Sequence, residues 1–133
     1  MTYVLGTNII TAVLKGNEKV KKRVQEVIIK GEEIFINGIS YYEIKRGFLA
    51  KDATTQLGKF DLLCKKFGLL LLDTQSIFDE AAEIYANLQK KGKPIGDADI
   101  LIASSARMWD FTLVSDDTDF ANVIGLRIEN WLT

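Results

Sequence analysis

Short apolar runs alternate with amphipathic stretches along the whole chain. The runs lie at residues 3–5, 34–36, 69–72 and 112–114, and a last short strand is expected at 127–129. Continuous apolar runs of this length are typical of strands that are covered on both faces. Between the runs, apolar residues recur every three or four positions, as on a helix with one buried face. The pattern therefore predicts strands alternating with helices.

Turn-forming and capping residues place the ends of the expected helices. Thr7 and Asn8 follow the first strand and are expected to cap a helix that carries Ile9 to Leu14. Ser40 and Glu43 have the spacing of a capping box, which predicts a helix start there. The other expected helices cover 18–30 and 53–67, a stretch that begins at Thr74 or Ser76 and ends in Lys90-Lys91-Gly92, and a stretch that begins at Asp97 to Asp99.

This order predicts a single α/β domain over residues 1–133, with a mostly parallel sheet and helices on both of its faces. Sites in such sheets form outside the carboxyl ends of the strands, where the strand order reverses. Apolar residues make up 47% and charged residues 26% of the chain, as in ordinary globular proteins. No stretch predicts a membrane span or a secretory signal, so a cytoplasmic protein without membrane contact is expected.

Composition excludes several kinds of chemistry. The chain contains no histidine, which removes serine and cysteine triads that use an imidazole base and the HExxH zinc site. It contains one cysteine, Cys64, within a helical apolar pattern, so it is expected in the core and no internal disulfide can form. An enzyme with this composition would need carboxylates, lysines or a metal ion.

Acidic residues occur at the expected strand ends and in the helix turns that follow them. They are Glu43, Asp97, Asp99, Asp116, Asp117 and Asp119. Most have a structural explanation of their own: Glu43 would close the capping box, Asp97 and Asp99 would favour the start of a helix, and Asp116 and Asp117 would belong to a loop rich in turn-forming residues. Parallel topology, however, brings all of these strand ends to one edge. Carboxylates crowded there repel one another unless a cation lies among them, and hard oxygen ligands suit Mg²⁺ or Mn²⁺.

Four segments carry a resemblance to a known family. They read VLGTNIITAVLKGN, ISYYEIKRG, KGKPIGDADILIASSAR and TLVSDDTDFANVIGLRIENW. In this order and spacing they resemble the PIN-domain ribonucleases of the VapC toxin type. That family reads L-D-T-N-I at the first strand end, where this chain reads Leu5-Gly6-Thr7-Asn8-Ile9. Its three later acids fall on Glu43, Asp99 and Asp117, with Asp97 in a more variable place of the motif and with Asp116 and Asp119 as helpers.

The resemblance implies a PIN-like three-layer domain with a five-stranded sheet and a metal-dependent endoribonuclease that uses Mg²⁺ or Mn²⁺. Its substrate would be structured RNA, such as transfer or ribosomal RNA. Glu43, Asp99 and Asp117 would be the catalytic, metal-holding acids, and Thr7 and Asn8 would support the metal or the phosphate. The implied assembly is a homodimer held in check by a VapB-type antitoxin, with DNA bound only indirectly through that antitoxin.

Gly6 is the departure from the family pattern, because it stands where the first carboxylate is expected. Glycine provides neither a ligand oxygen nor a charge. One explanation is a loss of activity through a single base change in an aspartate codon; the other is a member of the family that binds without cutting. Both predict a weak or inactive nuclease.

Basic residues offer a route for RNA, and Arg46 is the leading candidate for a contact; Lys45, Lys90, Lys91 and Lys93 are further candidates. Two rival functions stay open. One is a non-catalytic regulatory subunit that binds an antitoxin; the other is a phosphatase or phosphate switch, which Gly6 and the lack of a strand-end lysine disfavour.

Overall fold

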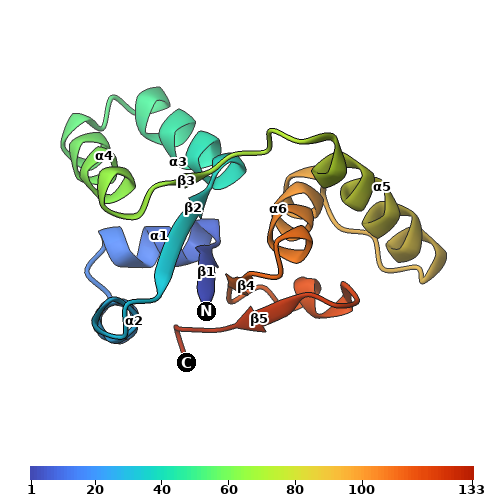
Figure 1. Cartoon of the computed structure of the whole chain (residues 1–133). Helices are drawn as coiled ribbons and strands as arrows, with labels where there is room; N and C mark the ends of the chain where they lie inside the picture. The colour runs from blue at the N-terminus through green and yellow to red at the C-terminus, as the bar shows by residue number, and fades with distance from the viewer.

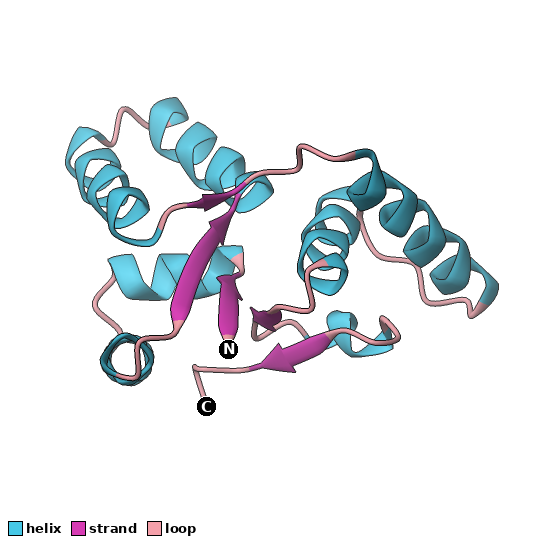
Figure 2. Ribbon diagram, in the orientation of Figure 1, coloured by secondary structure: helices cyan, strands magenta, loops and turns pink.

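The computed structural model describes all 133 residues and contains one five-stranded parallel sheet between helices (Figures 1 and 2). The strands are β1 (Thr2–Leu5), β2 (Glu33–Asn37), β3 (Leu69–Leu70), β4 (Thr112–Val114) and β5 (Arg127–Glu129). Their order in the sheet is β3-β2-β1-β4-β5, and every neighbouring pair is parallel. The predicted α/β class and five-stranded sheet are confirmed.

Six α-helices and a short 3-10 helix connect the strands. They are α1 (Thr7–Leu14), α2 (Glu18–Ile29), α3 (Gly38–Ala50), α4 (Thr54–Phe67), α5 (Gln75–Lys90), α6 (Asp97–Met108) and η1 (Thr118–Asn122). No helix is long and apolar enough to cross a bilayer.

The sheet separates two apolar cores. Successive side chains of a strand point to opposite faces, and in β1 Tyr3 and Leu5 belong to one core whereas Val4 belongs to the other. The first core joins the sheet to α1, α2, α3 and α4, and the second joins it to α5, α6 and η1. Figure 1 shows these two groups of helices on opposite sides of the strands. The result is a helix–sheet–helix sandwich.

Three details of the predicted helix starts are wrong. Helix α1 begins at Thr7 after Gly6, and no side chain caps it, because the Thr7 hydroxyl points to α3 instead. Helix α3 begins at Gly38 rather than at Ser40, since the buried Asn37 side chain accepts the Ile39 N–H at 2.8 Å. Thr74 precedes α5 without a capping hydrogen bond from its side chain.

The third strand is shorter than expected. The apolar run predicts a strand over residues 69–72, but only Leu69 and Leu70 pair with β2. The helix before it ends as predicted at Gly68, whose φ of 77° favours glycine. Cys64 is half-buried and packs against the first core, as its helical position predicts.

The strand order reverses at β1. Strand β1 pairs with β2 on one side and with β4 on the other, so the chain leaves β1 for one edge of the sheet and later returns to the opposite side. The carboxyl ends of β1 and β4 flank the crevice that this reversal creates, which is where sites form in parallel α/β sheets.

Candidate active site

A hollow of about 200 Å³ lies at this crevice. Five elements enclose it: the end of β1, the first turn of α1, the middle of α3, the start of α6 and the segment after β4. Its lining residues are Gly6, Thr7, Asn8, Glu43, Asp99, Ile102, Ser115, Asp117 and Phe120. Three of these are carboxylates, and none is basic. The structure therefore brings Glu43, Asp99 and Asp117 to one place from three separate parts of the sequence.

Thr7 holds the Glu43 carboxylate. Its Oγ1 lies 3.0 Å from Glu43 Oε1 and 3.0 Å from the Oγ of Ser40, which is buried one turn earlier on α3. A threonine hydroxyl has one proton. The carboxylate is the stronger acceptor, so Thr7 donates to Glu43 and accepts from Ser40. Ser40 and Glu43 thus belong to a side-chain network of the site and not to a helix cap.

Asp99 lies in the most acidic surroundings. It stands in the first turn of α6, half-buried against the hollow. Burial raises the pKa of Asp99 above its ordinary value of 3.8, and the negative charges of Asp117, Glu43 and Asp119 raise it further. Such mutual repulsion is what a bound cation relieves.

Asp117 is fixed by the turn after β4. Its backbone N–H donates to Ser115 Oγ at 3.0 Å, and its Oδ1 accepts the N–H of Asp119 at 2.9 Å. The second bond caps η1 and leaves the other carboxylate oxygen of Asp117 free of that cap. Asp119 is exposed and contributes charge to the site without lining the hollow.

Gly6 is buried at the carboxyl end of β1 and lines the same hollow. Its φ of −75° and ψ of 166° are ordinary extended values that any residue adopts, so the backbone does not require glycine here. A Cβ at this position would lie 3.0 Å from the carbonyl oxygen of Val114 and 3.7 Å from Ser115 Cβ. A larger residue fits if β1 and β4 separate by a few tenths of an ångström.

The remaining predicted site residues lie outside the hollow, apart from Asn8. Asp97 is exposed at the start of α6. Asp116 is exposed, and its Oδ1 accepts a hydrogen bond of 3.1 Å from the Asn8 side chain. The guanidinium of Arg46 lies over the Tyr42 ring, 5.0 Å from its centroid, and donates to the Tyr42 hydroxyl at 3.4 Å.

The other basic candidates are also held elsewhere. Lys45 donates to the Tyr41 hydroxyl at 2.9 Å, and Lys91 donates to the Asn122 carbonyl at 3.2 Å. Lys90 and Lys93 are exposed and do not line the hollow.

The comparisons with known proteins decide the family. Residues 3–126 match the PIN domain family. The chain belongs to the PIN-domain family. Ribonuclease VapC2 of Rickettsia felis is 28% identical over 133 residues, and Ribonuclease VapC1 of Haemophilus influenzae strain R2866 is 25% identical over 134 residues; each alignment covers 98% of both chains. The crystal structure of VapBC2 from Rickettsia felis, bound to a DNA fragment from its promoter, superposes with a TM-score of 0.91 at 28% identity, covering 98% of this chain and 99% of that one.

The acids of this PIN domain suit a divalent cation by chemistry but form an incomplete set. Carboxylate oxygens are the ligands that Mg²⁺ and Mn²⁺ prefer. No group of three or more acidic or cysteine side chains is placed so that it could hold one ion as it stands. Gly6, which has no carboxylate, lines the same hollow as all three acids.

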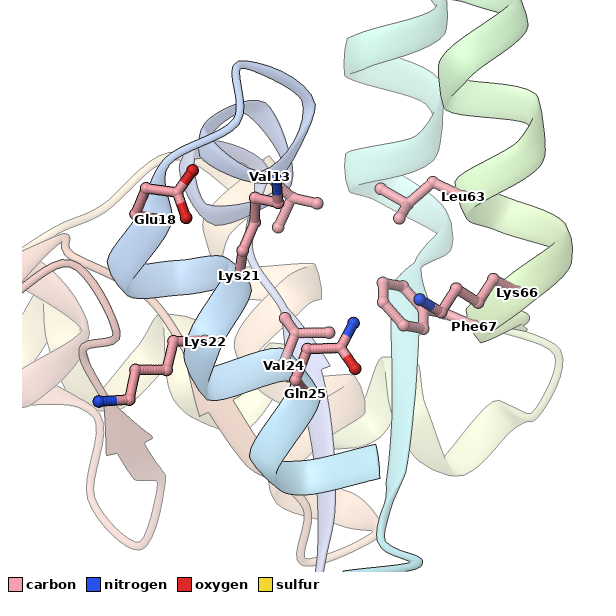
Figure 3. A pocket seen from close by; sticks show the side chains of 9 residues that line it. All are labelled: Val13, Glu18, Lys21, Lys22, Val24, Gln25, Leu63, Lys66 and Phe67. Carbon is pink, nitrogen blue, oxygen red and sulfur yellow. The ribbon is translucent and has the colours of Figure 1, made fainter. Parts of the chain in front are cut away.

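A second hollow of this PIN domain lies away from the acids, between α1, α2 and α4 (Figure 3). It has a volume of about 320 Å³ and combines apolar side chains such as Val24 and Phe67 with three lysines, Lys21, Lys22 and Lys66. None of the predicted site residues lines it, so it has no part in the candidate active site.

Sequence reasoning missed Ser115, Ile102 and Phe120 as lining residues. Ser115 directly follows β4, so its strand-end position was a usable signal. Ile102 is an apolar residue on the buried face of the expected helix, and Phe120 follows the acidic turn after β4. Only the packing of α6 and η1 shows that each also borders the hollow.

Proposed function

We propose that this chain has the scaffold of a VapC-type endoribonuclease toxin and that Gly6 leaves it weakly active or inactive. The observation that carries the proposal is the shared hollow of Glu43, Asp99 and Asp117 with Gly6 in its lining. The relatives named Ribonuclease VapC support the reaction class, because their alignments cover almost all of the chain.

The proposed cofactor is Mg²⁺ or Mn²⁺, which Glu43, Asp99 and Asp117 would hold together with a carboxylate at position 6. When bound, such an ion lowers the pKa of water and stabilises the charge that develops on a phosphodiester. Thr7 fixes the orientation of Glu43 through its hydroxyl, and the Ser115 hydroxyl fixes the turn that carries Asp117. We propose that Asn8, which lines the hollow and donates to Asp116, contacts the phosphate.

The proposed partners follow from the same likeness. The structures of VapBC complexes support a VapB-type antitoxin as the partner, with DNA reached through it. We further propose an RNA substrate, a homodimer and a cytoplasmic location. Arg46 remains a candidate for an RNA contact, since the Arg46–Tyr42 pair is exposed on the helix that carries Glu43.

The missing carboxylate favours a second candidate function, a non-catalytic subunit that binds the antitoxin. Removal of one central electrostatic group typically lowers a catalysed rate by about 10²–10³. The two candidates differ in whether the rest of the site is competent for cleavage once position 6 carries an acid.

The test is cleavage of total RNA by the Gly6→Asp variant with Mg²⁺ and with Mn²⁺. Gly6→Ala fills the same Cβ position without a carboxylate, and Gly6→Asp combined with Asp99→Asn removes a second acid. We expect metal-dependent cleavage by Gly6→Asp alone, at least about a hundredfold above the starting chain. Equal cleavage by all four proteins would show that position 6 is not catalytic. No cleavage by any of them, with retained binding of a VapB-type antitoxin, would support the non-catalytic subunit.

A further inference from the structure

Two more hollows follow the candidate active site along α1. The first has a volume of about 410 Å³ and shares Asn8 with the acidic hollow. The second has a volume of about 300 Å³, lies between α1 and α4, and shares Thr11 and Lys15 with the first. Asn8, Thr11 and Lys15 are spaced by three and four residues, so they lie on one face of the helix. This face connects all three hollows.

The charge changes from acidic to basic along this face, through a connecting hollow that is lined by one acid, Asp116, and one lysine, Lys15. The hollow at Gly6 is lined by three carboxylates and no basic residue. The hollow between α1 and α4 is lined by Lys15 and Lys59 and by no acidic residue. Both lysines are exposed, and neither forms an ion pair within the chain. The half-buried Leu14 and Phe48 provide apolar surface in the same hollow.

We propose that this face of α1 carries a single strand of RNA out of the active site, with Lys15 and Lys59 binding its phosphates. The inference rests on the proposed ribonuclease function and extends it to residues that the family motif does not include. Basic side chains attract the neighbouring phosphates of a strand that has one phosphate in the acidic hollow. Lys15 and Lys59 are the basic residues of the connected hollows. Lysines beside an apolar or aromatic surface are the usual elements of a single-strand site.

The helix also sets the length of the proposed path. Seven residues separate Asn8 from Lys15, a rise of about 10 Å at about 1.5 Å per residue. About three stacked nucleotides cover this distance at about 3.4 Å each. Lys15 therefore contacts a phosphate about three nucleotides from the one at Asn8. Both lysines contribute to the binding only of strands longer than about three nucleotides.

The test is the binding of a fluorescent single-stranded 12-nucleotide RNA to the full chain with Mg²⁺, over a range of salt concentrations. The Gly6 chain is suited to it because cleavage is expected to be slow. The variants are Lys15→Gln, Lys59→Gln and their combination. Lys30→Gln and Lys51→Gln remove exposed lysines that line neither hollow and serve as controls. Thermal melting checks that each variant is folded.

We expect each single variant in the path to weaken RNA binding and to lower the slope of log affinity against log salt by about 0.7, the value for one phosphate contact on a single strand. The controls keep the slope of the starting chain. Binding by the starting chain with no difference between path variants and controls would overturn the inference but leave the proposed function standing. The inference would also be overturned, with the proposed function intact, if the path variants kept RNA binding but lost binding of a VapB-type antitoxin. Absence of RNA binding by the starting chain and by Gly6→Asp alike would overturn both.

Discussion

The Thr7 hydroxyl donates a hydrogen bond of 3.0 Å to the Glu43 carboxylate and thereby joins the start of α1 to the middle of α3. The two residues are separated by 36 positions in the sequence. Thr7 also contacts Ser40, so two side chains of α3 depend on its single hydroxyl. The orientation of one candidate catalytic acid is therefore set by the residue that directly follows Gly6.

Replacement of Thr7 by valine should lower the free energy of unfolding by about 1–2 kcal/mol, because Glu43 loses a charged hydrogen bond in a partly buried place. Valine keeps the branched shape of threonine, so packing changes little. Thr54→Val, at an exposed position in the first turn of α4, is the control and should change stability by less than about 0.5 kcal/mol. Chemical denaturation measures both. Equal stability of the two variants would show that the contact contributes nothing.

Replacement of Gly6 by aspartate should cost stability in the absence of metal. The appropriate reference is Gly6→Asn, since both side chains have nearly the same shape and meet the same 3.0 Å approach to the Val114 carbonyl, but only aspartate adds a negative charge. Without divalent ions near neutral pH, the aspartate variant should melt at the lower temperature. Its free energy of unfolding should be lower by about 1 kcal/mol, which corresponds to about one pKa unit.

Excess Mg²⁺ or Mn²⁺ should reverse this order, because ligand binding stabilises only the variant that binds it. Melting curves with chelator and with metal give both comparisons. An aspartate variant that is already the more stable without metal would contradict the crowding of acids at this site.

The fold was predictable because its signals are local. Continuous apolar runs and helical spacing identify β1, β2 and β4 from the residues alone, and parallel topology then brings their carboxyl ends together. The helix starts were less predictable, because a capping box and a tertiary contact use the same residues. Ser40 and Glu43 have the capping spacing, but the Asn37 side chain was available for the cap and Thr7 for the acid.

The candidate site, like the fold, was predictable from the sequence only in part. The positions of Glu43, Asp99 and Asp117 followed from motif and topology, whereas the exclusion of Asp97 and Asp116 did not. Asp116 and Asp117 are adjacent and of the same residue type, so the sequence does not show which of the two side chains points into the hollow. The turn stabilised by Ser115 turns Asp117 into the hollow and leaves Asp116 to Asn8.

Replacement of Asp99 by asparagine should stabilise the chain at neutral pH. The pKa of Asp99 is raised by burial and by the charges of Asp117, Glu43 and Asp119. A carboxyl with a raised folded-state pKa contributes its full stability below the ordinary value of 3.8 and loses it as the pH rises through the folded pKa. The asparagine variant avoids this loss, so its advantage should appear above pH 3.8 and level off near neutrality.

Asp97→Asn is the matched control for this change. Asp97 also lies in the first turn of α6 but is exposed outside the hollow, so both substitutions lose the same interaction with the helix dipole. Melting temperatures from pH 3.5 to 8 for both variants separate the two effects. A pH-independent difference between Asp99→Asn and the starting chain would show that repulsion in the hollow is not its cause.

Replacement of Asn37 by alanine should be among the most damaging polar substitutions. The Asn37 side chain is fully buried; its Oδ1 accepts the Ile39 N–H at 2.8 Å, and its amide donates to Ser105 Oγ. Alanine removes the cap of α3 and leaves the half-buried Ile39 N–H and the buried Ser105 hydroxyl with one partner fewer. Loss of a cap costs about 1 kcal/mol and an unsatisfied buried group about 1–3 kcal/mol, so a total of about 2–4 kcal/mol is expected.

Asn17→Ala offers the comparison, because Asn17 caps α2 by the same kind of bond, to the Val20 N–H at 3.1 Å, without a buried partner on another helix. It should cost only about 1 kcal/mol. The two variants also differ in their effect on the site. Asn37 positions α3 and with it Glu43, so Asn37→Ala in the Gly6→Asp background should reduce metal-dependent stabilisation, whereas Asn17→Ala should leave it unchanged. Equal losses in stability and in the response to metal would place the cap of α3 among ordinary helix caps, with no special connection to the acidic hollow.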